Sequence, residues 1–308
     1  MAEILEARAK IISCVGGKYT VAFPSCEGGR TVGNLAAKGA FRHERIKPLP
    51  GDDVILRDDG TGYFITGICG RKNSLIRPPL ANLDVLYIVT SCRTPAPVPG
   101  FADKITVICE KSNISPVIIV TKSELDPDLA DRITSVYRAC GYKAFSTSVE
   151  ISDGVDALRE FIDGKRGTVS AFCGASGVGK STLMNALFPE LPFRCEVGDV
   201  SRRIERGKNT TRTVTLYRTA PDTYVADTPG FSMLDFERFD LCDKDELPYM
   251  FPEFSRYLCR CKYTKCSHTK EDGCLIREAV SRGEIPGSRY ASYLSLYEDV
   301  KNKKEWEK

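Results

Sequence analysis

The sequence lacks both a long hydrophobic run and a secretory signal pattern. Its apolar stretches, such as residues 116–120, fall far short of the ~18 residues that a membrane-spanning helix needs. The first ten residues, MAEILEARAK, carry charges throughout and have no apolar centre, so no signal peptide is read. We therefore expect a cytoplasmic protein with no membrane partner.

An excess of charge of one sign is also missing. The 44 Lys and Arg residues nearly balance the 41 Asp and Glu residues, which leaves a formal net charge of +3. This charge alone does not indicate a nucleic-acid binder, so any basic surface must be local. Histidine is scarce, with only His43 and His268. The length of 308 residues is typical of two or three domains.

Cysteine, in contrast, is abundant, with 13 residues. In a chain without an export signal, buried thiols or a metal site are expected rather than disulfides. Nine of the cysteines lie outside any metal-like spacing and are interpreted as small apolar core residues. The other four crowd into residues 259–274.

The pattern of apolar, polar and turn-forming residues changes twice along the chain. In residues 1–72, short strands alternate with Gly-rich turns, which predicts a small OB-like β-barrel. In residues 73–234, apolar strands alternate with helical patterns, which is typical of a parallel α/β sheet. Residues 235–308 are polar and aromatic, hold the cysteine cluster and end in a helical, lysine-rich tail. We predict a multidomain α/β protein with these three domains.

A phosphate-binding loop follows the apolar strand predicted at residues 168–173. The segment has the spacing G-x-x-x-x-G-K-[ST], and a predicted helix begins directly after it. Backbone N–H groups of such a loop surround a phosphate, the Lys180 ammonium reaches the β- and γ-phosphates, and the Ser181 hydroxyl completes a magnesium shell. The predicted nucleotide-binding residues here are Gly174, Ala175, Ser176, Gly177, Val178, Gly179, Lys180, Ser181 and Thr182.

Further magnesium ligands are predicted downstream of this loop. Asp227 begins an Asp-Thr-Pro-Gly segment at the end of a predicted strand, where a carboxylate can hold magnesium through water. Between Lys180 and Asp227, the basic segment 207–212 contains Thr210 and Thr211. A mobile loop that supplies a threonine hydroxyl to magnesium is the functional interpretation, and a solvated basic loop is the alternative. The pattern does not decide which threonine acts.

Base recognition is predicted upstream of the phosphate loop. GTPases read guanine with Asn-Lys-x-Asp after a strand. The nearest segment here is Thr121-Lys122-Ser123-Glu124, which follows the predicted strand 116–120. A second segment, at Ser146 and Thr147, is expected to offer a backbone N–H to the base carbonyl. The half that reads the base therefore precedes the half that holds the phosphates.

This order of motifs resembles the circularly permuted GTPases and, more narrowly, the family of small-ribosomal-subunit-dependent GTPases, RsgA. The resemblance covers nearly the whole chain, including Phe-Pro-Glu at 251–253 and the cysteine cluster. It implies an OB-like barrel, a circularly permuted P-loop GTPase domain and a helical zinc-binding C-terminal domain. Two residues depart from the pattern: Thr121 replaces Asn, and Glu124 replaces Asp. We expect guanine preference to survive these changes.

The residues at the expected catalytic positions differ further from those of other GTPases. Phe231 stands where many GTPases carry a water-orienting Gln, and Asn209 stands where the resemblance implies a His. Asn209 can orient water but cannot take a proton at neutral pH. We therefore predict slow intrinsic hydrolysis that a partner accelerates. The candidate catalytic residues are Lys180, Asn209 and Thr211.

The cysteine cluster has the form Cys261-x₄-Cys266-x-His268-x₅-Cys274. Three thiolates and one imidazole at short spacings are typical of a four-coordinate structural zinc site, and the resemblance implies zinc at this motif. Metal binding would stabilise this polar segment by roughly 10 kcal/mol. Cys259 remains an alternative to Cys261 as a ligand. The alternative is that these cysteines are buried free thiols that bind no metal.

Basic residues gather at four places, each of which is more often a solvated face than a binding surface. They lie near Arg42, in segment 202–212, around the cysteine cluster and in the C-terminal tail. Together they suggest a divided polyanion-binding surface, and the resemblance implies the small ribosomal subunit and its rRNA as the target. We expect a monomeric GTPase that binds GTP and GDP with Mg²⁺. The rivals are a P-loop kinase and a non-catalytic, GTP-dependent RNA-binding module.

Overall fold

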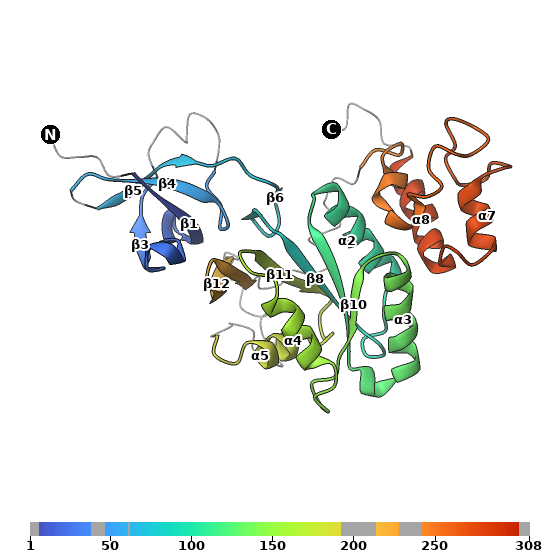
Figure 1. Cartoon of the computed structure of the whole chain (residues 1–308), viewed down its shortest axis with the longest axis horizontal. Helices are drawn as coiled ribbons and strands as arrows, with labels where there is room; N and C mark the ends of the chain where they lie inside the picture. The colour runs from blue at the N-terminus through green and yellow to red at the C-terminus, as the bar shows by residue number, and fades with distance from the viewer. Residues whose placement is uncertain (1–5, 38–46, 61, 192–213, 228–241, 302–308) are drawn as a thin grey trace, which may run out of the picture. The chain divides into compact units, whose positions relative to one another are not determined.

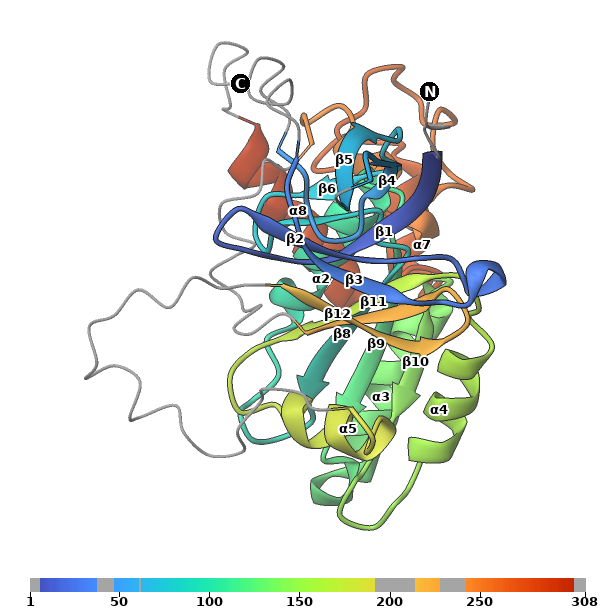
Figure 2. The same ribbon diagram turned by 90° about the vertical axis from the view of Figure 1, so that its left-hand side faces the viewer.

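The structure is a computed structural model, and it describes residues 6–37, 47–60, 62–191, 214–227 and 242–301 (Figures 1 and 2). The chain divides into two compact units. Unit 1 comprises Met1–Leu86, Asp156–Cys173 and Lys180–Phe231, and unit 2 comprises Tyr87–Val155, Gly174–Gly179 and Ser232–Lys308.

Unit 1 begins with an antiparallel barrel. Its strands are β1 (Glu6–Val15), β2 (Lys18–Ala22), β3 (Thr31–Leu35), β4 (Asp53–Asp58) and β5 (Tyr63–Ile68). β1 pairs with both β2 and β4, β2 pairs with β3, and β4 pairs with β5. A parallel bridge between Ala37 and Ile65 closes the circle. The order β1-β2-β3-β5-β4 is that of a five-stranded OB-like barrel.

The barrel core follows from the alternation of apolar and polar residues along its strands. In β1, for example, Ala9 and Ile11 are buried, while Lys10 between them is half-buried and Arg8 before them is exposed. Side chains of successive strand residues point to opposite faces, so the apolar set fills the interior. The core residues are Ala9, Ile11, Tyr19, Val21, Phe23, Leu35, Val54, Leu56 and Ile65.

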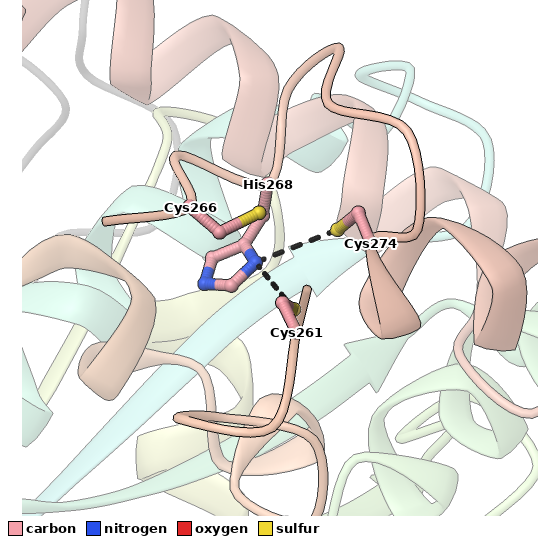
Figure 3. A group of neighbouring side chains, drawn as sticks. All are labelled: Cys261, Cys266, His268 and Cys274. Carbon is pink, nitrogen blue, oxygen red and sulfur yellow. Dashed lines mark hydrogen bonds between the residues drawn. The ribbon is translucent and has the colours of Figure 1, made fainter. Parts of the chain in front are cut away.

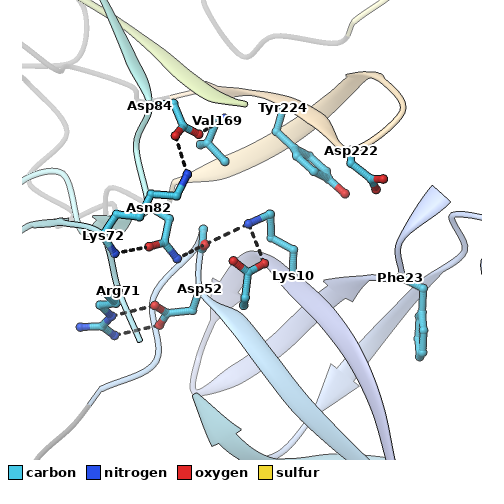
Figure 4. Close-up of polar contacts among 12 residues, drawn as sticks. Lys10, Phe23, Asp52, Arg71, Lys72, Asn82, Asp84, Val169, Asp222 and Tyr224 are labelled. Atoms are coloured by element: carbon cyan, nitrogen blue, oxygen red, sulfur yellow. Dashed lines mark hydrogen bonds and ion pairs between the residues drawn. The ribbon is translucent and has the colours of Figure 1, made fainter. Parts of the chain in front are cut away.

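A polar joint connects the barrel to the segment that follows it. The hairpin of β6 (Ser74–Leu75) and β7 (Leu80–Ala81) leads away from β5. Arg71 donates two hydrogen bonds to the buried Asp52 carboxylate, at 2.7 and 2.8 Å. Asn82 donates to the Gly51 carbonyl at 3.0 Å, and Lys72 pairs with Asp84 at 2.6 Å (Figure 4). This exit from the barrel is a hydrogen-bonded structure rather than an unsupported linker.

The second part of unit 1 holds β11 (Val169–Gly174), β12 (Thr215–Ala220), β13 (Thr223–Asp227), α5 (Lys180–Leu187) and most of α4 (Val155–Asp163). β11 and β13 are parallel, as the alternation of strands and helices predicts. β12 runs antiparallel to β13, because only Pro221 and Asp222 connect the two strands, and antiparallel strands suit so short a connection. β12 also pairs with barrel strand β1, Thr215 opposite Ser13.

Unit 2 contains the other strands of the α/β part. β10 (Lys143–Ser146) pairs in parallel with β9 (Ser115–Thr121), and β8 (Val85–Ser91) lies on the other side of β9 (Figure 2). β8 and β9 are almost continuously apolar and buried, as expected for a parallel sheet. α2 (Pro99–Lys111) and α3 (Pro127–Ala139) pack against this sheet (Figure 1).

The C-terminal part of unit 2 packs on α2 through helix α8 (Gly287–Val300). Its other elements are the short helices η3 (Leu247–Met250) and η4 (Pro252–Phe254) and helix α7 (Leu275–Ser281). Arg289 of α8 is fully buried and pairs with Asp103 of α2 at 2.6 Å and with Glu253 at 2.7 Å. Burial alone would lower the pKa of Arg289, but these two carboxylates outweigh it and raise the pKa well above its usual value.

The fold class predicted from the sequence is confirmed, with the OB-like barrel and the α/β strands in the expected segments. The domain boundaries 1–72, 73–234 and 235–308 stay a prediction. Among the described residues, no helix is both long and apolar enough to span a membrane. Segment 207–212, with Asn209, Thr210 and Thr211, and residue Phe231 lie outside the described residues.

Candidate functional site: a nucleotide loop system and a metal cluster

The predicted phosphate loop lies between β11 and α5. Strand β11 is buried along its whole length and ends at Gly174, and α5 begins at Lys180. Gly177 and Gly179 adopt left-handed backbone conformations, with φ of 81° and 89°, which residues with a side chain rarely adopt. The strand–loop–helix context that this motif requires is therefore present.

The base-reading segment is tied directly to the phosphate loop within unit 2. The buried Thr121 hydroxyl donates to the Val178 carbonyl and also contacts the Thr90 carbonyl at 3.1 Å. The Lys122 ammonium donates to the Gly177 carbonyl at 2.9 Å. Thr121, which stands in place of Asn, is thus in direct contact with the phosphate loop.

Two buried polar atoms of this segment have no hydrogen-bond partner in the part of the chain that the structure describes. They are Oε2 of Glu124 and Oγ of Ser123. Buried polar atoms are nearly always paired, so an orphaned carboxylate oxygen needs an explanation. A ligand that donates N–H groups to Glu124 would satisfy it, as the edge of guanine does.

The second base-reading segment lies beside the first. The Ser123 N–H donates to the Thr147 carbonyl at 3.2 Å, and the Thr147 N–H donates to the Val120 carbonyl at 2.8 Å. Ser146 is the last residue of β10, and Thr147 is fully buried. The structure brings Ser146 and Thr147 next to Ser123, but the Thr147 N–H, a predicted donor to the base, is used by the fold itself.

The predicted phosphate and magnesium residues of unit 1 begin or end regular elements. Lys180, Ser181 and Thr182 form the first turn of α5. Asp227 is the last residue of β13, is 3% exposed and lies opposite Thr215 in the β12–β13 hairpin. The chemistry of this set, an ammonium, hydroxyls and a carboxylate, suits a magnesium-bound phosphate.

The described part of unit 1 also holds a cavity of about 400 Å³ beside the barrel joint. Its lining includes Lys10 and Lys72, which are already paired with Asp53 and Asp84 at 2.8 and 2.6 Å. The predicted nucleotide-binding residues are not among those that line it.

A candidate metal centre forms in the C-terminal part of unit 2. Ligand atoms of Cys261, Cys266, His268 and Cys274 all lie within 4.8 Å of one another (Figure 3). Nδ1 of His268 is 3.6 Å from Sγ of Cys261 and 3.5 Å from Sγ of Cys274. A tetrahedral zinc ion with ordinary bond lengths places its sulfur and nitrogen ligands about 3.5 Å apart. The four predicted residues therefore fit a tetrahedral metal.

The loop around this cluster is held by groups that sequence reasoning did not single out. The Glu271 carboxylate accepts from the Ser267 N–H at 2.8 Å and from the Thr269 N–H at 3.0 Å. Burial would raise the pKa of Glu271, but hydrogen bonds from Ser267 and nearby backbone N–H groups outweigh it and lower the pKa to about 2. The Tyr290 hydroxyl donates to the His268 carbonyl at 2.8 Å.

Cys259, which the sequence left open as a ligand, lies elsewhere. It is exposed, and its Sγ lies 3.5 Å from the Tyr249 hydroxyl. Cys261 and not Cys259 belongs to the cluster.

The role of Glu271 could have been predicted from the sequence, because a carboxylate between metal-ligand positions can cap the N–H groups of a tight loop.

Comparisons with known proteins agree with this geometry over nearly the whole chain. The model of the RsgA GTPase family matches residues 68–237. The small ribosomal subunit biogenesis GTPase RsgA of Geobacillus thermodenitrificans is 40% identical over 303 residues, which cover 97% of this chain and 99% of that protein. The protein of the same name from Bacillus cereus (strain ATCC 10987 / NRS 248) is 37% identical over 300 residues, 96% of this chain and 98% of that protein.

Two solved structures share the fold. YjeQ from Thermotoga maritima has a TM-score of 0.81 at 30% identity, covering 97% of this chain and 100% of that one. YloQ, described as a circularly permuted GTPase, has a TM-score of 0.78 at 33% identity, covering 97% and 96%. Fold and motif order thus define a GTPase of the circularly permuted class. Within this class, the chain belongs to the RsgA GTPase family.

Proposed function

We propose that this GTPase binds the small ribosomal subunit with GTP, acts in its late maturation and leaves after hydrolysis to GDP. The names of its relatives support this role, since they are small ribosomal subunit biogenesis GTPases. The observation that carries guanine recognition is the buried Oε2 of Glu124, which has no hydrogen-bond partner among the described residues and lies on a loop tethered to the phosphate loop.

The residue roles follow from the chemistry of each group. The Glu124 carboxylate accepts the two N–H groups on the guanine edge, and the Lys122 stem packs over the ring. Backbone N–H groups of residues 174–179 and the Lys180 ammonium hold the phosphates. Ser181, Asp227 and a threonine of the pair Thr210 and Thr211 would hold Mg²⁺, which neutralises phosphate charge when bound.

Hydrolysis in this proposal depends on the partner. The chain has Phe231 where many GTPases place a water-orienting Gln, and Asn209 is the nearest polar candidate for that task. An amide positions water without accepting its proton. The intrinsic rate is therefore low, and binding of the subunit raises it.

The metal centre is assigned to structural zinc. Three thiolates and one imidazole favour zinc over oxygen-preferring cations, and four protein ligands leave no open position for catalysis. The barrel, the G domain and the zinc module, at 1–72, 73–234 and 235–308, would present their basic residues to rRNA. We place this monomeric protein in the cytoplasm, where the subunit matures.

A hydrolysis assay with GTP and ATP, with and without purified small subunits, tests the proposal. We expect slow GTP turnover alone, at least a tenfold rise with subunits, and guanine over adenine selectivity of up to ~10⁴, as hydrogen-bonding sites reach. Glu124→Gln should abolish the selectivity, and Glu150→Gln, at an exposed residue of the neighbouring loop, should not. Equal use of ATP would refute guanine recognition. Tight GTP binding without subunit-stimulated turnover would instead favour the non-catalytic RNA-binding module.

A further inference from the structure

Gly154 occupies a position where the backbone of a neighbouring segment leaves no room for a side chain. It has φ of +67° and directly precedes α4. A Cβ atom at this residue would lie 2.1 Å from the Ser146 carbonyl oxygen and 3.5 Å from Cα of Thr147. The turn that brings Gly154 back to Ser146 is closed by a hydrogen bond from the Ser148 N–H to the Asp153 carbonyl, at 2.9 Å.

The segment that Gly154 touches supports the base-reading loop. The Thr147 carbonyl accepts the Ser123 N–H at 3.2 Å. Ser123 directly precedes Glu124, whose Oε2 is buried without a partner in the described part of the chain. A continuous series of contacts therefore runs from Gly154, through the 146–147 backbone, to Ser123 and Glu124.

We propose that Gly154 is a positioning residue for guanine selection. It fixes the place of Glu124 through the Thr147 carbonyl and the Ser123 N–H. This inference rests on the proposed role of Glu124. A side chain at residue 154 must push the Ser146 carbonyl from 2.1 Å to at least 3.0 Å away. A displacement of this size in the 146–147 backbone exceeds the margin between the present Ser123–Thr147 distance of 3.2 Å and the ~3.5 Å limit of a hydrogen bond. The Glu124 carboxylate then loses its fixed place.

The test compares Gly154→Ala with Gly141→Ala. Gly141 also has a left-handed backbone, with φ of +91°, but a Cβ there would meet nothing within 4 Å. Both variants therefore suffer backbone strain, and only Gly154→Ala displaces the loop. Binding of GDP and of IDP, which lacks the 2-amino group of guanine, is measured by titration calorimetry for each protein.

We expect Gly154→Ala to lower the GDP/IDP affinity ratio by about tenfold, the factor that one hydrogen bond to a charged group contributes. Gly141→Ala should keep the wild-type ratio. Equal loss of GDP and IDP affinity in Gly154→Ala would reduce Gly154 to a merely structural role and overturn the inference.

Hydrogen exchange on the wild-type protein provides a second test that does not depend on how a variant folds. The Ser123 amide should exchange slowly, because the Thr147 carbonyl holds it. Exchange at the rate of an open loop would overturn the inference. A different result would refute the proposed function itself: a wild-type protein that binds GDP no better than IDP or ADP. If Glu124→Gln abolishes the preference and Gly154→Ala leaves it intact, only the Gly154 inference fails.

Discussion

The barrel in unit 1 and the C-terminal part of unit 2, which holds the Cys/His cluster, are attached to their neighbours by different means. The barrel joins β12 by strand pairing, and Arg218 of β12 donates to the Phe23 and Gly29 carbonyls, both at 2.7 Å. The C-terminal part joins α2 through one buried cation, Arg289, and two buried carboxylates. The first attachment consists mainly of hydrogen bonds to backbone, and the second concentrates charge in the interior.

The difference predicts unequal tolerance to mutation. Loss of one side chain from the barrel attachment leaves carbonyl groups that water can still reach, because Arg218 is only half-buried. Removal of Arg289 leaves two carboxylates without their cation in a site that excludes water, which is far more costly. Four predictions, ordered from the largest effect to the smallest, test this comparison.

Loss of the proposed zinc should have the largest effect, and the effect should be confined to the C-terminal part that holds the Cys/His cluster. Cys274→Ser deletes one of the four clustered ligands, and structural zinc contributes roughly 10 kcal/mol in small modules. We expect loss of bound zinc, measured by elemental analysis, and fast hydrogen exchange in α7 and the metal loop. The barrel amides should keep their protection. Cys259→Ser, at an exposed cysteine outside the cluster, is the matched control.

Arg289→Ala should destabilise unit 2 by about 3–5 kcal/mol, because it leaves the Asp103 and Glu253 carboxylates buried and unpaired. The measurement is chemical denaturation monitored by hydrogen exchange in α2 and α8. Arg282→Ala, which removes an exposed cation paired with Glu284 at 2.7 Å, should have a much smaller effect, because water screens exposed ion pairs. Similar losses for the two variants would contradict the contrast between the attachments.

Arg218→Ala should destabilise unit 1 by about 1–3 kcal/mol, through loss of hydrogen bonds from a charged group. The loop between β2 and β3 should open first, because its Phe23 and Gly29 carbonyls lose their donor. Hydrogen exchange in residues 23–30 measures this opening, with Arg57→Ala at an exposed ion pair with Glu6 as the control. An effect as large as that of Arg289→Ala would show that the barrel attachment also depends on buried charge.

The smallest effect concerns pH and Glu271. Its pKa in the folded protein is lowered to about 2 from an ordinary value of 4.5. The stability that it contributes is therefore fully present above pH 4.5 and is lost as the pH falls towards 2. A side-chain NMR titration should place its midpoint near 2, and Glu271→Gln should remove that signal while the protein stays folded at neutral pH. A midpoint near 4.5 would contradict the hydrogen-bonded loop.

Much of the fold could be predicted from sequence, because local patterns determine it. A helix was predicted directly after the phosphate loop, and α5 is observed there at Lys180–Leu187, since a glycine-rich loop fixes its start. β3 and β12 were missed. Their short, partly polar sequences, TVGNL and TLYRTA, gain strand structure from their partners β2, β13 and β1, and tertiary pairing of this kind overrides local propensity.

The side-chain interactions were only partly predictable. The metal cluster follows from spacing along a single short segment, and it is found at the four predicted residues. Arg289 gave no such signal, because its partner Asp103 is 186 positions away in the sequence. A residue whose role depends on a distant backbone or charge cannot be recognised from its neighbours in sequence.

The pairing of β1 with β12 has a consequence for dissecting the protein. Where Ser13 lies opposite Thr215, the barrel strand covers one side of β12, and β13 covers the other. Removing residues 1–72 would turn β12 into an open sheet edge, which invites pairing between molecules and aggregation. The barrel thus also protects the edge of the neighbouring strand from pairing between molecules. A protein that lacks residues 1–72 would self-associate, so assays of its GTP binding would mainly reflect that self-association.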